Sequence, residues 1–166
     1  IGGGLIIDGK IDIDKMRQSI NHVIEKNDGL RLQFTENNGV PVQYVADYME
    51  EKIEFRDFSY NTDPEEEQRR WSTELFHKQF ELIENKLYHF ALYKINDNKY
   101  GVLLIVHHII ADGWSINLIE KQVCENYKQL VDCKELDVEE KSSYLDYIEH
   151  ESNYLCLLYT SDAADD

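Results

Sequence analysis

Apolar residues recur along the chain with two periods, which predict helices alternating with strands. Spacings of three and four predict amphipathic helices, and they cover residues 12–27, 62–80 and 115–130, with a last helical piece over 138–153. Acidic residues begin the first helix, and Gly29 follows its end at a position suited to a left-handed cap. Trp71, Leu75 and Phe80 are expected to face the core from the second helix.

Alternation of apolar and polar residues predicts strands between these helices. The predicted strands cover residues 30–34, 40–45, 53–58, 87–95 and 100–106, and the first residues of the chain also have the composition of a strand. Asn37-Asn38-Gly39 predicts a hairpin turn, and the apolar stretch Tyr100 to Val106 is expected in the middle of a sheet. The fold class predicted is therefore α/β, a mixed sheet with helices packed on it.

Charge and cysteine content narrow the possible functions. The 166 residues include 33 acidic and 17 basic side chains, for a net charge of −16. Nucleic acids and anionic membranes need a basic surface, so neither is expected as a partner. Three cysteines without a Cys-x-x-Cys pair suggest a reducing, cytoplasmic setting, and Val102 to Val106 is too short to span a membrane.

Both ends of the chain suggest a fragment. The chain begins at Ile1, inside what is expected to be a strand. Residues 156–166 contain no basic residue and no helical apolar period. We expect them to be a non-native tail derived from a sequencing adapter, the alternative being a genuine acidic tail. The domain prediction is one domain over residues 1–155.

One segment has the composition of a reaction site, because two histidines and a carboxylate follow the most apolar strand. Neighbouring side chains on a strand point to opposite faces, so one of His107 and His108 should face a channel while the other packs inward. Gly113 permits a tight turn before the next helix. We expect Asp112 to be buried and to pair with Arg31, which lies in an alternating apolar strand.

Other interpretations of this segment have less support. A histidine beside an apolar strand is more often a packed core residue than a catalytic one. A metal site is not expected, because alternation separates the two rings and no third His or Cys lies at ligand spacing. A serine hydrolase is disfavoured because the chain has no Gly-x-Ser-x-Gly sequence.

His107-His108-x-x-x-Asp112-Gly113 resembles the active-site motif of condensation domains of nonribosomal peptide synthetases, which have the chloramphenicol-acetyltransferase-like fold. Four further stretches resemble family motifs in order and spacing: residues 26–34, 39–43, 80–87 and 144–147. Three residues depart from the usual ones: Lys26 and Asn27 stand where Arg and His are usual, and Lys86 where Pro is usual. The family's opening Ser-x-Ala-Gln motif and its second half are absent, so the resemblance implies a two-layer sandwich that is the N-terminal lobe of a two-lobed domain.

The resemblance also implies roles for individual residues. His108 corresponds to the catalytic histidine, which takes a proton from the attacking amine or holds the amine in line; both roles are left open. His107, Asp112 and Arg31 would be structural residues of the active site, and Gly113 would allow close approach of substrate. Trp114 and Ser115 are candidates for the substrate channel.

The implied activity is amide formation between a carrier-bound acyl or peptidyl thioester and the amine of a carrier-bound aminoacyl acceptor. The implied partners are upstream and downstream peptidyl carrier domains, the missing C-terminal lobe and an adenylation domain. No bound cofactor is implied, since the 4′-phosphopantetheine arm belongs to the carrier. Alternatives are an epimerisation domain, a wax-ester or diacylglycerol-type acyltransferase, or a non-catalytic docking platform, and the fragment alone is expected to be inactive.

Overall fold

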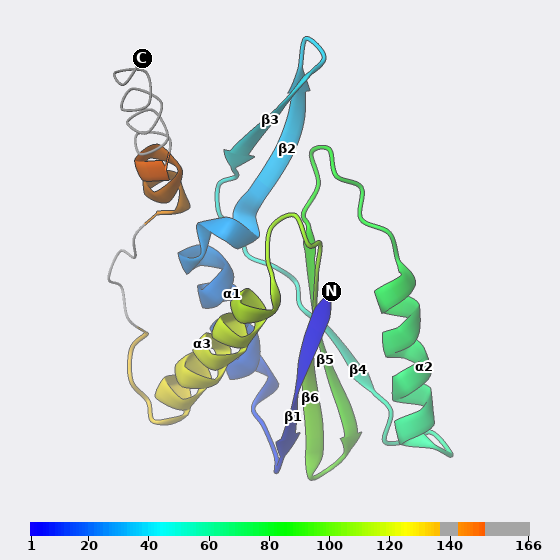
Figure 1. Cartoon of the computed structure of the whole chain (residues 1–166). Coiled ribbons are helices and arrows are strands. Elements are labelled where there is room, and N and C mark those ends of the chain that lie inside the picture. Colours follow the sequence, from blue (N-terminus) through cyan, green and yellow to red (C-terminus); the bar gives the residue numbers. More distant parts are fainter. Residues whose placement is uncertain (137–142, 152–166) are drawn as a thin grey trace, which may run out of the picture.

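A four-stranded mixed sheet, with the strand order β1-β6-β5-β4, forms the centre of the structure (Figure 1). The computed structural model describes residues 1–136 and 143–151. The strands are β1 (Gly2–Asp8), β4 (Glu54–Asp57), β5 (Tyr88–Asn96) and β6 (Lys99–Val106). β6 pairs antiparallel with β1 and β5, whereas β4 pairs parallel with β5. The predicted central position of β6 is confirmed.

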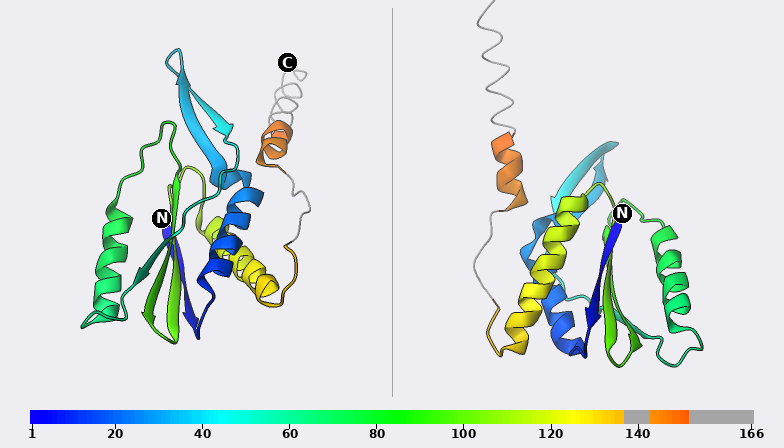
Figure 2. Two further views of the ribbon diagram at one scale, coloured as in Figure 1. Left: turned by 180° about the vertical axis from the view of Figure 1, so that it is seen from behind. Right: turned by 60° about the horizontal axis from the view of Figure 1, so that its bottom comes forward.

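Helices cover both faces of this sheet (Figures 1 and 2). α1 (Ile13–Lys26) and α3 (Gly113–Val131) pack on one face, and α2 (Pro64–His77) lies against the other. The larger apolar cluster joins Ile20 and Ile119 of the two helices to Leu104 of β6. A smaller cluster on the α2 side contains Trp71 and Phe58. The predicted mixed sheet with packed helices is therefore confirmed.

Each of these three helices begins after an aspartate whose side chain accepts backbone N–H groups of the first turn, as the acidic helix starts predict. Asp12 accepts from Asp14 and Lys15 at 3.0 and 3.1 Å. Asp63 accepts from the N–H of Glu66 at 3.1 Å, and Asp112 caps α3. α2 ends at His77 rather than near residue 80, because an extended Lys78 ends the helix.

A separate hairpin, β2 (Leu32–Asn37) with β3 (Val40–Val45), extends away from the main sheet (Figure 1). Its turn residues Asn38 and Gly39 both have left-handed backbones, at φ 53° and 80°, which such a two-residue turn requires. The strand predicted from residue 30 starts only at Leu32, because Asp28–Arg31 forms a 3₁₀ helix, η1. Gly29 lies inside η1 and does not have a left-handed backbone.

Two of the sequence predictions concern segments that are not fully described. The last predicted helix, 138–153, is described only in part, and residues 144–151 of it are helical. The expected foreign tail, 156–166, lies outside the described residues. None of the helices in residues 1–136 and 143–151 combines the length and apolarity that crossing a membrane requires.

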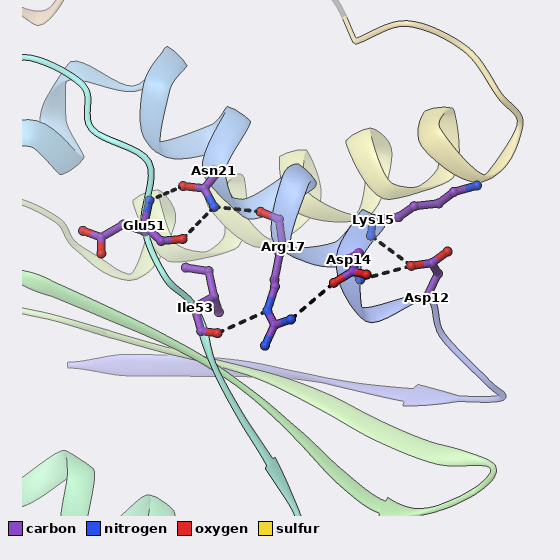
Figure 3. Close-up of polar contacts among 7 residues, drawn as sticks. All are labelled: Asp12, Asp14, Lys15, Arg17, Asn21, Glu51 and Ile53. Atoms are coloured by element: carbon purple, nitrogen blue, oxygen red, sulfur yellow. Dashed lines mark hydrogen bonds and ion pairs between the residues drawn. The ribbon is translucent and has the colours of Figure 1, made fainter.

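The loop between β3 and β4 is held against α1 by one buried amide side chain (Figure 3). Asn21 is 6% exposed, and its Oδ1 accepts the Glu51 N–H at 2.6 Å. Its Nδ2 donates to the carbonyl oxygens of Glu51 and Arg17 at 3.0 and 3.1 Å. The Tyr48 hydroxyl also donates to Oδ1, at 3.3 Å. Asn21 thus supplies partners for both main-chain groups of Glu51, and the Arg17 Nε–H donates to the Ile53 carbonyl oxygen of the same loop at 3.3 Å.

We predict that Asn21→Ala lowers the free energy of unfolding by about 2–3 kcal/mol, because it leaves the Glu51 N–H without its acceptor in a partly buried site and removes the amide bonds to the Glu51 and Arg17 carbonyl oxygens. Urea unfolding of the chain measures this change. Tyr48→Phe is the matched control, since it removes one hydroxyl from the same cluster and should cost about 1 kcal/mol or less. An equal effect of the two variants would contradict the role assigned to Asn21.

Candidate active site

The two histidines lie in a loop, residues 107–112, that connects the end of β6 to the start of α3; we refer to it as the histidine loop. The His107 N–H donates to the Leu87 carbonyl oxygen at 2.8 Å, which extends the β5–β6 ladder by one bond. The Ile110 N–H donates to the His107 carbonyl oxygen at 3.1 Å and closes a turn. The position of the loop is therefore set by the main chain of the central strands.

The two imidazole rings lie in different environments, one packed and one exposed, as expected from the sequence. The His107 ring is half-buried, and its Nδ1 accepts the Ile109 N–H at 3.1 Å. It also meets the Phe80 ring edge to face, with centroids 6.2 Å apart. Since Nδ1 is an acceptor, a neutral His107 carries its proton on Nε2. The His108 ring is exposed and has no hydrogen-bond partner among the described residues.

The expectation that Asp112 is buried is wrong, because its carboxylate is exposed and caps α3. Asp112 Oδ1 accepts the Ser115 N–H at 2.8 Å and the Ser115 hydroxyl at 2.7 Å. The Ser115 N–H, followed by the hydroxyl, holds the pKa of the Asp112 carboxyl below its ordinary value, since both bonds favour the charged form. The carboxylate satisfies a free N–H at the helix start.

The predicted Asp112–Arg31 pair is likewise not formed. The Arg31 guanidinium pairs instead with Asp28, three residues earlier in η1, and its Nη1 donates to the Ala46 carbonyl oxygen at 3.2 Å. The 3₁₀ turn brings residues three apart together, so Asp28 reaches Arg31 from the same turn. Arg31 joins η1 to the end of β3.

Gly113, Trp114 and Ser115 form the first turn of α3, beside the histidine loop. Gly113 has no left-handed backbone, so the tight turn expected there does not require glycine. A Cβ atom placed on Gly113 would meet nothing within 4 Å. Trp114 is 85% exposed, whereas the Ser115 hydroxyl is engaged by Asp112. The N-terminal end of α3 thus presents an open surface next to His108.

A groove of about 480 Å³ runs beside the histidine loop. Its lining is mainly apolar and comes from four places: residues 26–32, the loop residues 109–111, one side of α3, and residues 143–147. Two hydrogen bonds between residues that line this groove were not predicted from the sequence. Asn27 donates to Gln122 at 2.8 Å, and Ser143 donates to Asp28 at 2.6 Å. The paired residues are 95 and 115 positions apart, so no local sequence pattern indicates either hydrogen bond.

No group of three or more His, Cys, Asp or Glu side chains is arranged to hold a metal ion in the described parts of the chain. His108 is exposed, and the next residue in the chain, Ile109, lines the apolar groove.

Comparison with known proteins shows similarity to one family along nearly the whole chain. The family model for the condensation domain matches residues 4–157. Surfactin synthase subunit 1 of Bacillus subtilis (strain 168) is 30% identical over 153 residues, 92% of this chain. Gramicidin S synthase 2 of Aneurinibacillus migulanus is 30% identical over 124 residues, 75% of this chain. The aligned parts are 4% and 3% of these two relatives, so the chain spans a small fraction of their length.

Solved structures agree on the fold. The starter condensation domain of the rhizomide synthetase RzmA superposes with a TM-score of 0.86 at 23% identity, over 93% of this chain and 38% of that one. VibH, a condensation enzyme, superposes with a TM-score of 0.78 at 19% identity, over 93% of this chain and 35% of VibH. The fold is therefore chloramphenicol-acetyltransferase-like, as expected.

We predict that the stabilising effect of the Asp112 cap disappears in acid. The folded state lowers the pKa of this carboxyl below its ordinary 3.8, so the stabilisation is present above that value and is lost as the pH falls through the lower, folded pKa. Asp112→Ala should lower the melting temperature by about 2–4 °C at pH 7. Calorimetry of both proteins from pH 7 to 2.5 should find this difference shrinking below about pH 4.

Asp112→Asn is the control, because an amide oxygen still accepts the Ser115 N–H and does not titrate in this range. A difference between the wild type and Asp112→Ala that stays constant from pH 7 to 2.5 would contradict the assigned cap.

Proposed function

Because the chain belongs to the condensation-domain family, we propose that it forms part of an enzyme that makes amide bonds in nonribosomal peptide synthesis. The donor is an acyl or peptidyl thioester on one carrier domain, and the acceptor is an aminoacyl group on another. The names of the relatives, which are synthases of surfactin and gramicidin S, support peptide synthesis over the related acyl-transfer reactions.

The observation that carries the proposal is the environment of His108. Its ring is exposed, has no partner among the described residues, and stands where β6 ends and α3 begins. The neighbouring His107 is held by Ile109 and Phe80, so the loop is fixed while the His108 ring stays available. A side chain that acts on a substrate needs both a rigid support and a free polar atom.

The proposed reaction conserves atoms and protons as follows. The acceptor nitrogen attacks the donor carbonyl carbon, a C–N bond forms, and the C–S bond to the donor arm breaks. One proton leaves the amine and protonates the departing thiolate. His108 accepts this proton or orients the amine by a hydrogen bond, and such assistance accelerates reactions by roughly 10²–10⁴-fold.

Partners and carriers follow from this chemistry. The chain itself is proposed to bind no resident cofactor, since both substrates arrive on the 4′-phosphopantetheine arms of upstream and downstream carrier domains. We further propose that activity requires a second lobe and an adenylation domain. The solved RzmA domain is long enough to hold such a lobe, because this chain covers 38% of it.

We predict that His108→Ala in the complete synthetase lowers peptide formation by at least about 10²-fold without unfolding the domain. The exposed ring makes no hydrogen bond, ion pair or ring contact with the described residues, so the melting temperature should stay within about 1 °C. Mass spectrometry of the carrier-bound product measures the activity. His107→Ala is the control and should lower stability by about 1–2 kcal/mol, because it removes the Phe80 and Ile109 contacts.

Normal peptide formation by His108→Ala would refute its assigned role. A product that contains an ester, or an inverted stereocentre without a new amide bond, would refute the proposed reaction and favour a related acyltransferase or an epimerisation domain.

We predict that Gly113→Ala separates activity from stability. Nothing described lies within 4 Å of the added Cβ, and alanine suits a helix better than glycine, so the melting temperature should not fall. If substrate passes close to this backbone, condensation should fall about tenfold or more. The same calorimetry and product assay apply, and unchanged activity would contradict close approach of substrate at Gly113.

A further inference from the structure

We propose that Asp28 is a positioning residue: it holds residues 143–151 as one wall of the groove beside the histidine loop, and so sets the width of the groove in which a substrate would bind. The use of the groove by a substrate rests on the proposed function. The holding of the segment does not, because it is a matter of contacts within this chain.

The Asp28 carboxylate joins three segments that are distant in the sequence. One oxygen pairs with Arg31, which in turn donates to the Ala46 carbonyl oxygen at the end of β3. The other oxygen accepts the Ser143 hydroxyl at 2.6 Å. The side chains of Asp28 and Arg31 are only 21% and 18% exposed, so water screens this pair less than it screens an exposed one.

The Ser143 hydroxyl has a second function at the same point. It accepts the Leu145 N–H at 3.1 Å and so caps the helical residues 144–151. The first turn of that helix is thereby attached to Asp28, and Figure 1 shows it beside η1 and the end of α1. Tyr144 and Tyr147 stack with centroids 6.3 Å apart, and both line the groove.

The rest of the groove is fixed independently of Asp28. Asn27 donates to Gln122 and ties the end of α1 to α3, while Ile109 and Ile110 belong to the histidine loop. A displacement of residues 143–151 would therefore change the width of the groove and leave the His108 ring in place. The expected consequence is weaker substrate binding rather than slower chemistry.

The first test is hydrogen exchange in the 166-residue chain. Loss of the Ser143–Asp28 bond should speed exchange of the amides of residues 145–151 about tenfold in Asp28→Ala and in Ser143→Ala. The double variant should exchange little faster than the faster single variant, because each single variant already breaks the Ser143–Asp28 bond. Asp28→Asn keeps an acceptor oxygen and Ser143→Thr keeps the hydroxyl donor. Exchange of residues 145–151 should stay as slow in these two variants as in the wild type.

Asp63→Ala is the matched control, since it removes an aspartate cap from α2, on the other face of the sheet. It should leave the exchange of residues 145–151 unchanged. Unchanged exchange in Ser143→Ala would overturn the proposal, and that variant keeps the Asp28–Arg31 pair if Asp28→Ala fails to fold.

The second test is steady-state kinetics of the complete synthetase. Ser143→Ala should raise KM for a substrate about 2–10-fold and change kcat less than twofold, whereas His108→Ala should lower kcat. An unchanged KM in Ser143→Ala, with an active wild type, would overturn the positioning role. Absence of amide formation by the wild type would instead overturn the proposed function, and hydrogen exchange would then decide whether Asp28 holds the segment.

Discussion

Burial of β6 on both faces is the constraint on which the rest of the structure depends. Every residue from Tyr100 to Val106 is buried, between two neighbouring strands and two helical layers. Each fully buried large aliphatic side chain contributes about 1.5–3 kcal/mol. The strand cannot slip by one residue without exchanging its two apolar faces, so its register with β1 and β5 is well defined. The register of β6 also fixes where the histidine loop begins, because the loop starts at the residue after the strand.

The charged groups near the histidine loop pair with neighbours in the sequence rather than with each other. Asp112 is three residues from an N–H that needs an acceptor, and this local contact forms instead of a long-range pair with Arg31. Arg31 likewise pairs with a near neighbour, Asp28, which lies three residues earlier in the same 3₁₀ turn. The two charged residues stabilise different elements, α3 and the junction of η1 with β3, and in the described parts of the chain neither forms a hydrogen bond or ion pair with His108.

The candidate site has two parts, the histidine loop with its supports and the groove beside it. The first part is the end of β6, the packed His107 ring and the capped start of α3. The second part is the groove, one wall of which is proposed to depend on the hydrogen bond between Ser143 and Asp28, 115 positions apart.

Local patterns in the sequence were sufficient for the strands and helices of the main sheet, for the Asn38-Gly39 turn and for the motif around His108. Periodicity and caps act over a few residues, and the chain satisfies them locally. The sequence also placed the two imidazoles in unlike environments. Tertiary structure alone decided the partners of Arg31 and Asp112, the packing of Phe80 on His107, and the bond from Ser143 to Asp28. Charged and hydroxyl groups can each be satisfied by several partners, and only the folded chain shows which of those partners lies within hydrogen-bond distance.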